Sequence, residues 1–441
     1  MKTEVLFSFD AEDYTSQRNA DAILALANML TEEGVTGHFA VVGLLAQQLV
    51  SWGRQDVLEA LAPHVIGCHS YSHSMHPVMA EMSDIEDYET ASRRVAEMEQ
   101  KGLDILHNVF KGKEILFAVP PGSDTSYTAQ YFYAEQGIPF YFDTPVCDKE
   151  NSLLDYCSLT QIPYTVAMEQ IFMGSRPMDV ERLLDELSGM RRVILYHHPN
   201  MSVKKTFWDK LNYDGHNERA FGDWIEAEDR PLGETLAFWS NYRRLIRRLK
   251  ADERFVVTDA YALLRERKKH LPSTMTREEI PPIAAELNKS LAPKPIGSYC
   301  VSDLFYAMAE FLKGGTAYVP GLVKGFLSRP EGIQKPVTVS RDDIRQAAAQ
   351  IKTGGFIPEQ IRVGDALLGP ADYLFAMAEA LCSGASEITL QPRPQLVDIS
   401  DLPKLEALAL KGKWLFSPDF QDSYVSDRLR LQAWTLRKYG Y

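Results

Sequence analysis

The chain has 441 residues, about three times the size of a typical domain, so two domains are expected. Hydrophobic residues make up 45% and charged residues 24% of the chain, an ordinary globular composition that excludes a disordered or fibrous protein. The 60 acidic residues outnumber the 47 basic residues, and the formal net charge is -13. Because that charge repels a polyanion, we expect no nucleic-acid partner.

Cysteine usage and the apolar segments bear on the compartment. The five cysteines are dispersed without a Cys-x-x-Cys pair, which fits a reducing compartment rather than a disulfide framework. Asp10 follows the first apolar segment too early for a signal peptide, and no segment approaches the roughly 20 apolar residues that span a bilayer. We therefore expect a soluble, cytoplasmic protein without a membrane partner.

Short β-like segments alternate with helical patterns over about the first 265 residues. Residues 20–30, for example, carry apolar side chains at helical spacing and are followed by Gly34. Helices that alternate with continuously apolar strands predict a parallel sheet buried on both faces. About six to eight such units fit a (β/α) barrel better than a small open sheet. The expected strands are residues 4–9, 37–42, 64–67, 114–118, 139–142, 192–196 and 255–257.

The chain changes character near Leu271, beyond which helical spacing dominates and strand-like segments are rare. Residues 301–310 resemble residues 369–379, with Asp303 and Asp372 at matching positions. The similarity predicts an all-α domain built from a duplicated helical module. Helix capping explains the recurring aspartates without any ligand.

Two domains follow from these patterns. A catalytic barrel is expected over residues 1–268, and a helical domain over residues 272–441, with its repeats at about 274–312 and 338–381. The role of the helical domain stays open, and a protein or a glycan is the expected kind of partner for it.

Three polar segments follow predicted strands. Acidic residues at 10–13 end the first strand, His69 and His73 follow the third, and His197 and His198 close a later one. The C-terminal strand ends of a parallel barrel converge on one mouth, where active sites lie. Two imidazoles four residues apart, with a carboxylate from a neighbouring loop, can hold a metal and leave positions open for water and substrate. Each piece alone is common in proteins without metal, but their combination favours a metal site.

Residues 3–265 resemble the polysaccharide deacetylases of carbohydrate esterase family 4, the NodB-homology proteins. Residues 66–73, Ile-Gly-Cys-His-Ser-Tyr-Ser-His, match the family's second motif most specifically. Residues 7–14, Phe-Ser-Phe-Asp-Ala-Glu-Asp-Tyr, are similar to a variant first motif in which Asp-x-Glu-Asp replaces adjacent aspartates, and residues 36–43 are similar to the family's second strand. The resemblance implies a distorted (β/α) barrel of the NodB type.

The resemblance implies a metal centre formed by Asp13, His69 and His73. Glu12 is the alternative carboxylate ligand. We assign Asp13, because Glu12 would more naturally point into the following helix as an acidic residue of its first turn. The expected cofactor is a divalent metal, zinc, with cobalt and nickel as alternatives.

The resemblance also assigns Asp10 as the general base and His198, or its neighbour His197, as the general acid. Asp143 corresponds to the acid that orients the catalytic histidine. The third motif departs from the family, because Ala118 stands where an arginine usually pairs with the base. Asp10 is therefore expected to be tuned by another group or to be less effective.

The expected reaction is hydrolysis of an N-acyl group, usually acetyl, from a sugar or polysaccharide substrate. The turn at Tyr71 and the loop at Pro121 and Gly122 are expected to offer a backbone N–H to the oxyanion. Trp208 belongs to a group of aromatic residues near the expected mouth, and a sugar ring stacks well on such a face.

Two other functions stay open. A metal-independent amidohydrolase that opens cyclic ureides would tolerate the loss of the arginine, but would have no need of the two motif histidines with a carboxylate. A catalytically degenerate carbohydrate- or cell-wall-binding protein would suit the duplicated tail, which has a faint similarity to pseudomurein-binding repeats. Such a protein would have no reason to keep Asp10 and His198.

Overall fold

The computed structural model describes residues 2–173, 179–213, 223–410 and 414–439, and the chain forms two compact units. The first unit consists of Met1–Ser152, Gln161–Glu266 and Ala409–Val425. The second unit consists of Leu153–Thr160, Arg267–Leu408 and Ser426–Tyr441. The sequence predicted one boundary, between residues 268 and 272. The structure has a crossing at 266–267, and each unit also takes a segment from the other half of the chain.

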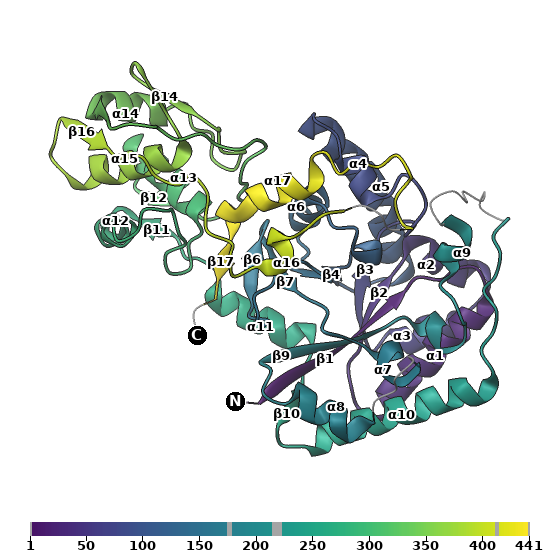
Figure 1. Cartoon of the computed structure of the whole chain (residues 1–441). Coiled ribbons are helices and arrows are strands. Elements are labelled where there is room, and N and C mark those ends of the chain that lie inside the picture. The colour runs from purple at the N-terminus through teal and green to yellow at the C-terminus, as the bar shows by residue number, and fades with distance from the viewer. Residues whose placement is uncertain (1, 174–178, 214–222, 411–413, 440–441) are drawn as a thin grey trace. The chain divides into compact units, whose positions relative to one another are not determined.

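A parallel sheet forms the centre of the first unit (Figure 1). Its strands, in spatial order, are β5 (Phe140–Phe142), β4 (Ile115–Ala118), β3 (Val65–Cys68), β2 (His38–Val41), β1 (Thr3–Ala11), β9 (Arg192–His197) and β8 (Val166–Ala167), and β10 (Phe255–Val257) pairs with the first residues of β1. The seven predicted strands are confirmed to within two residues at each end. Within the described residues β8 and β5 do not pair, so the sheet is a curled half-barrel rather than a closed barrel.

Amphipathic helices cover this sheet. α1 (Gln17–Glu32) buries Ile23, Leu26, Ala27 and Leu30, which recur at helical spacing, and Gly34 follows with a positive φ of 64°. The other helices of this part of the chain are α2 (Gly43–Ser51), α3 (Gln55–Leu61), α4 (Met79–Ser83), α5 (Tyr88–Val109), α6 (Tyr127–Glu135), α7 (Met168–Met173), α8 (Val180–Leu187), α9 (Trp208–Tyr213), α10 (Leu232–Ala251) and α11 (Ala260–His270).

The register of the sheet brings several strand ends to one edge. Ala11 lies opposite Val41 on β2, and Val41 lies opposite Cys68 on β3. On the other side of β1, Phe9 pairs with His197 at the end of β9. The residues that follow β1, β3 and β9 therefore emerge at the same edge, as the parallel arrangement requires.

The second unit is not all-α, which corrects the sequence prediction. Its strands form the short antiparallel pairs β11–β12 (Met275–Thr276 with Ala317–Tyr318), β13–β16 (Val337–Ser340 with Glu387–Leu390), β14–β15 (Ile361–Val363 with Ala366–Leu368) and β6–β17 (Leu154–Tyr156 with Arg437–Lys438). Strands of two to four residues are too short to produce a visible alternation in the sequence. Its helices are α12 (Ile280–Leu287), α13 (Val301–Leu312), α14 (Arg341–Ala348), α15 (Pro370–Cys382) and α16 (Pro403–Glu406), and the chain also contains β7 (Leu159–Ile162) and α17 (Val425–Leu431) near the unit boundaries.

In the second unit, the two recurring aspartates each cap the start of a helix, as expected. Asp303 accepts a hydrogen bond from the N–H of Cys300 at the start of α13, and Asp372 accepts one from the N–H of Gly369 at the start of α15. Both carboxylates are fully buried. Asp303 also accepts two hydrogen bonds of 3.0 Å from Arg437, and this charged partner offsets the cost of burying the carboxylate. None of the described helices is both long and apolar enough to cross a membrane.

Candidate active site

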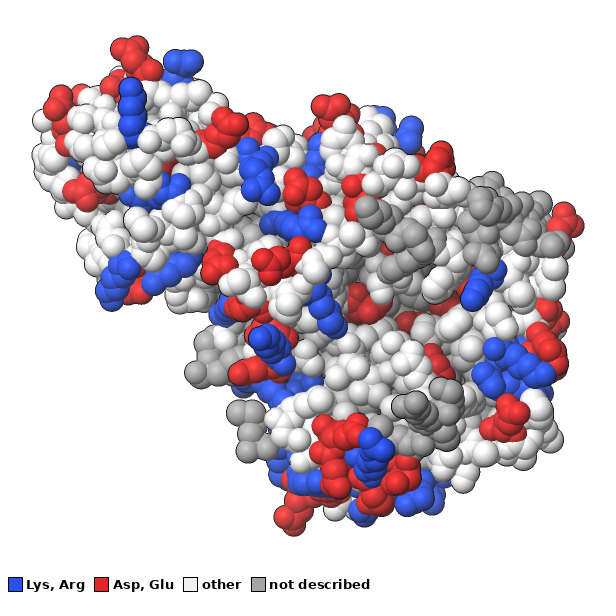
Figure 2. Space-filling view, in the orientation of Figure 1, with Lys and Arg blue, Asp and Glu red and all other residues white. Residues whose placement is uncertain are grey.

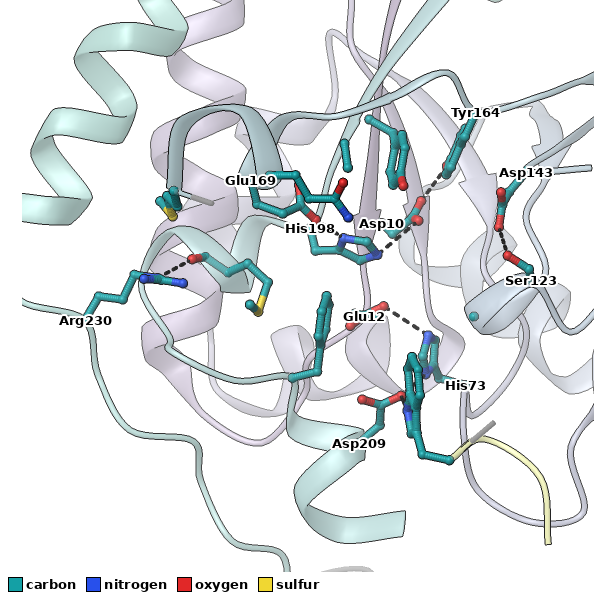
Figure 3. A pocket seen from close by; sticks show the side chains of 18 residues that line it. Asp10, Glu12, His73, Ser123, Asp143, Tyr164, Glu169, His198, Asp209 and Arg230 are labelled. Atoms are coloured by element: carbon teal, nitrogen blue, oxygen red, sulfur yellow. Dashed lines mark hydrogen bonds and ion pairs between the residues drawn. The ribbon is translucent and has the colours of Figure 1, made fainter. Parts of the chain in front are cut away.

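A cavity of about 580 Å³ opens in the first unit and is lined by residues from the predicted site segments. Asp10, Glu12, His73, Gly122 and His198 all face it. Figure 2 shows acidic side chains around the hollow in this face of the unit, and Figure 3 shows the lining side chains from close by. Residues from all three polar segments therefore converge on one cavity, as the strand ends predicted.

Glu12, His69 and His73 form a buried cluster, of which Glu12 and His73 line the cavity. Their ligand atoms lie within 4.8 Å of one another, and each residue is at most 5% exposed. The Oε2 atom of Glu12 is 3.0 Å from His73 Nε2 and 3.7 Å from His69 Nε2. Neither Nε2 atom, nor the Oε1 atom of Glu12, makes a hydrogen bond.

The hydrogen bonds on the far sides of the rings fix the direction of the two histidines. His69 Nδ1 lies 3.0 Å from the carbonyl oxygen of Val119, which can only accept, so this nitrogen carries a proton. Ser74 donates its single hydroxyl proton to Asp209, so at 2.5 Å from His73 it accepts from Nδ1–H. Both Nε2 lone pairs therefore face the carboxylate of Glu12, and three acceptors meet without a donor.

This cluster favours a positive charge. Burial lowers the pKa of His69, but the negative charges of Asp10 and Glu12 outweigh burial and raise it. Burial raises the pKa of Glu12, but the charges of His73 and His198 outweigh it and hold that pKa well below its usual range. Two imidazole nitrogens and one carboxylate oxygen are a donor set that zinc and similar divalent ions accept, so the residues present fit a metal ion.

The backbone around the second motif aims both histidines at one point. Ser70 and His73 adopt positive φ angles of 61° and 59°, in the left-handed region that side chains rarely occupy. The N–H of His73 donates to the Ser70 hydroxyl at 2.9 Å, which stabilises the turn. Such backbone strain is kept where the surrounding structure requires it, commonly at functional sites.

The structure brings Glu12, not Asp13, to the two histidines. The Oδ1 atom of Asp13 accepts hydrogen bonds from the backbone N–H and the hydroxyl of Thr15, which hold it in the loop after β1. Burial raises the pKa of Asp13 to about 7. Asp10, within β1, and Glu12, directly after it, both line the cavity, and Asp13 is not among the lining residues. The assignment of Asp13 as ligand is therefore corrected in favour of the alternative, Glu12.

Asp10 lies at the cavity wall and is held by a tyrosine. The hydroxyl of Tyr164 donates to Asp10 Oδ1 at 2.6 Å, and lies 3.0 Å from the hydroxyl of Ser8. The Tyr164 ring stacks on Tyr196 with 4.4 Å between centroids. Tyr164 thus contacts the carboxylate that a motif arginine was expected to hold, while Ala118 lies buried at the end of β4.

His198 lies between two carboxylates, as Figure 3 shows. Its Nδ1 atom is 2.6 Å from Glu169 Oε1, and its Nε2 atom is 3.6 Å from Asp10 Oδ2. Burial lowers the pKa of His198, but Glu169, Glu12 and Asp10 outweigh it and raise that pKa to about 10. A protonated imidazole therefore faces the cavity at neutral pH.

His197 also contacts Glu169, at 3.0 Å from Nδ1 to Oε2, but it is fully buried against Phe238 and does not line the cavity. Burial lowers the pKa of His197. Of the two neighbouring histidines, the structure therefore brings His198 to the site, and Glu169 contacts both.

The expected orienting acid is in a different place. Asp143 lines the cavity, but its Oδ2 atom accepts a hydrogen bond of 2.9 Å from Ser123 rather than from His198. The carboxylate at His198 Nδ1 is that of Glu169, from α7. The position of Asp143 after β5 was a reasonable signal, but Glu169 follows the short strand β8, which no sequence pattern revealed.

Of the expected substrate-binding residues, some line the cavity and others do not. Gly122 lines the cavity, and Pro121 is the buried residue before it. Tyr71 does not line it, and its carbonyl accepts from the N–H of Leu44. Trp208 is fully buried beside the ring of His73, with 5.9 Å between centroids, so it supports the site rather than facing it. Phe207 and Trp414 are aromatic residues that do line the cavity.

Sequence reasoning missed Tyr164, Glu169, Ser74 and Asp209. Tyr164 and Glu169 lie in a segment without a recognisable motif, and only the sheet register brings that segment beside β9. Ser74 follows the second motif directly, and a hydroxyl next to a candidate metal ligand is a signal that could have been used.

No protein-family model and no curated protein matches the chain. Among solved structures, a Mycobacterium smegmatis protein assigned to the polysaccharide deacetylases matches with a TM-score of 0.43 and 16% identity, over 62% of this chain and 92% of that one. A family 4 carbohydrate esterase of Streptomyces lividans, solved with acetate, matches with a TM-score of 0.33 and 14% identity, over 58% and 92%.

A family 4 pseudoenzyme of Bacillus anthracis matches with a TM-score of 0.29 and 13% identity, over 45% of this chain and 55% of that one. The neighbours include carbohydrate esterase family 4 proteins, and they include both enzymes and a pseudoenzyme. What this chain does has therefore to be inferred from its own site residues.

Proposed function

We propose that the chain is a metal-dependent hydrolase that removes an N-acyl group, with acetyl as the expected acyl group, from a carbohydrate or sugar precursor. The observation that carries the proposal is the cluster of acceptor atoms from Glu12, His69 and His73, in which Glu12 and His73 line the same cavity as Asp10 and His198. Three buried acceptors without a donor are costly unless a cation satisfies them, which argues against a metal-independent ring-opening enzyme.

Glu12, His69 and His73 would hold the metal, and zinc is the ion that this donor set suits best. A divalent ion bound there supplies Lewis-acid polarisation of an acyl carbonyl and makes a water more acidic. Glu12 and His73 line the cavity, so a metal held by these residues would be accessible to water and substrate. The resemblance of residues 7–14 and 66–73 to the deacetylase motifs supports the same assignment.

Two protein groups would move the protons. Asp10, held by Tyr164, removes the proton from the attacking water while the C–O bond forms. His198, protonated and held by Glu169, donates from Nε2 to the departing nitrogen while the C–N bond breaks. The products are a carboxylate and a free amine. A degenerate binding protein would not need this pair of opposed proton carriers.

The lining of the cavity supports an uncharged sugar as the substrate. Its described residues include Asp10, Glu12, Asp143, Glu169 and Asp209, while Arg230 is the only lysine or arginine among them. A divalent ion, Arg230 and protonated His198 leave the lining with an excess of negative charge. The aromatic faces of Phe207 and Trp414 offer surfaces on which a sugar ring stacks.

The test uses the full chain. We expect the purified protein to bind one zinc ion and to release acetate and free amine from N-acetylated glucosamine oligomers, measured together. His69→Ala and His73→Ala are each expected to lose bound metal and activity while keeping the circular dichroism spectrum of the wild type. Full activity in a metal-free wild-type protein would overturn the proposal.

A further inference from the structure

The metal ligand His73 begins a chain of hydrogen bonds that no sequence motif covers. Its Nδ1 atom contacts the hydroxyl of Ser74 at 2.5 Å, and that hydroxyl donates to Asp209 Oδ2 at 2.8 Å. Ser74 is fully buried and Asp209 is 2% exposed. The two residues are 135 positions apart in the sequence, and Asp209 stands in the first turn of α9.

The same oxygen of Asp209 has a second donor. Trp414 Nε1 donates to Asp209 Oδ2 at 3.0 Å, and Trp414 lines the cavity. Trp414 belongs to the C-terminal segment that is part of the first unit, which is drawn in yellow beside Asp209 and His73 in Figure 3. The Oδ2 atom of Asp209 thus accepts hydrogen bonds from both Ser74, the neighbour of His73, and Trp414, a residue of the cavity wall.

Carboxylates of the first unit also hold the backbone of this segment. Glu81 accepts from the N–H of Ser417 at 2.7 Å, and Asp84 accepts from those of Ser423 and Tyr424 at 2.9 and 2.6 Å. These hydrogen bonds hold the backbone that follows Trp414 against the first unit. The contact is therefore built into the fold of the unit.

We propose that Asp209 is a positioning residue of the metal centre that acts on His73 through Ser74, and that Trp414 holds Asp209 in place. The inference rests on the proposed metal site. Asp209 accepts the hydrogen bond that the Ser74 hydroxyl donates, so Ser74 accepts from His73 Nδ1–H, and His73 presents its Nε2 lone pair toward Glu12. Without Asp209, the Ser74 hydroxyl can rotate and donate to Nδ1, which favours the tautomer that cannot bind the metal.

The test measures zinc affinity in the full chain by competition with a chromophoric chelator. Loss of such an outer partner typically weakens metal binding about 10- to 100-fold, and we expect that range for Asp209→Ala and for Ser74→Ala. Asp209→Asn should be intermediate, because its carbonyl oxygen still accepts from Ser74. The double variant should be no weaker than Ser74→Ala, because Asp209 acts through that hydroxyl.

Two further variants test the tryptophan. Trp414→Phe keeps an aromatic ring but removes the N–H donor, and should weaken zinc binding less than Asp209→Ala does, with no added effect when Asp209 is already alanine. Trp239→Phe is the matched control, because Trp239 contacts His197 rather than a metal ligand, and its zinc affinity should equal that of the wild type. Melting temperatures of the metal-free variants separate a loss of fold from a loss of affinity.

An unchanged zinc affinity in Asp209→Ala would overturn the assignment. The assignment would also be overturned if Asp209→Ala weakened zinc binding by the same factor in the wild type and in Ser74→Ala. If Asp209→Ala does not fold, the same comparison is made with Asp209→Asn. An unchanged affinity in Trp414→Phe would overturn the role of Trp414. A wild-type chain that binds no divalent metal would overturn the proposed function and this inference together, whereas a chain that binds zinc without hydrolysing sugars leaves the inference standing.

Discussion

The hydroxyl of Tyr164 donates a 2.6 Å hydrogen bond to Asp10, a residue 154 positions earlier in the chain. Burial raises the pKa of Tyr164 well above its ordinary value, so the phenol stays protonated and remains a donor. A neutral hydroxyl orients the carboxylate without adding the positive charge that an arginine would bring. Ala118 stands where the resemblance places an arginine, and Tyr164 is the partner that the structure gives to Asp10, the proposed base.

Replacement of Tyr164 by phenylalanine should slow hydrolysis without changing metal content. The variant keeps the ring that stacks on Tyr196 and loses the hydroxyl, which donates to Asp10 and also contacts the hydroxyl of Ser8. A hydrogen bond to a charged group contributes about 1.5–3 kcal/mol, so we expect kcat to fall roughly 10- to 100-fold. Steady-state kinetics and zinc analysis on the same sample check this. An unchanged kcat would show that Tyr164 does not hold the base.

The contact between Glu169 and His198 predicts a pH effect. A general acid works while it is protonated, so activity should be lost as the pH rises through the His198 pKa of about 10. Glu169→Gln removes the charge that contributes most to raising this pKa, so the loss should begin at a lower pH in the variant. The measurement is the profile of kcat against pH in the wild type and in Glu169→Gln. Coincident alkaline limbs in the two proteins would contradict the role of Glu169.

The acidic lining predicts discrimination by substrate charge. We expect kcat/KM for N-acetylglucosamine to exceed that for its 6-phosphate by about fivefold or more, since repulsion between close charges costs about 1 kcal/mol or more. The difference should shrink as sodium chloride is added. Equal or better hydrolysis of the phosphorylated sugar at low salt would mean that the lining does not select an uncharged substrate.

The composition of the units predicts the effect of shortening the chain. A boundary at residue 268 implies that the N-terminal part folds alone, but Ala409–Val425 belongs to the first unit, where Leu415 and Phe416 are buried. Removing these side chains and the bonds to Glu81 and Asp84 should lower the melting temperature of a chain ending at residue 268 by about 10 °C or more. Calorimetry would contradict this if both chains melted at the same temperature.

Much of the fold was predictable because it depends on local pattern. Apolar segments and helical spacing gave the seven strands, and parallel pairing brought Asp10, His69 and His198 to one edge. The choice between Glu12 and Asp13 was also within reach. Side chains alternate along a strand, so Asp10 and Glu12 share a face when β1 continues to Ala11. The assignment of Asp13 came from treating Glu12 as an acidic residue in the first turn of the following helix, whereas α1 begins only at Gln17.

Other parts of the site depend on long-range contacts. Glu169 follows a strand of two residues, and Trp414 comes from a segment more than 200 positions after Asp209. No periodicity or spacing connects such residues, because their meeting is decided by the packing of the whole unit. The short strand pairs of the second unit were hidden for a related reason, since each strand is stabilised by a partner distant in sequence.

The central claim is that Glu12, His69 and His73 hold a catalytic metal, and the zinc content of Glu12→Gln and Asp13→Asn tests it most directly. Both substitutions replace one carboxylate oxygen by an amide nitrogen in neighbouring buried residues, so each is the control for the other. The account predicts that Glu12→Gln loses zinc after dialysis while Asp13→Asn retains about one ion per chain. Zinc lost from Asp13→Asn and retained in Glu12→Gln would contradict it.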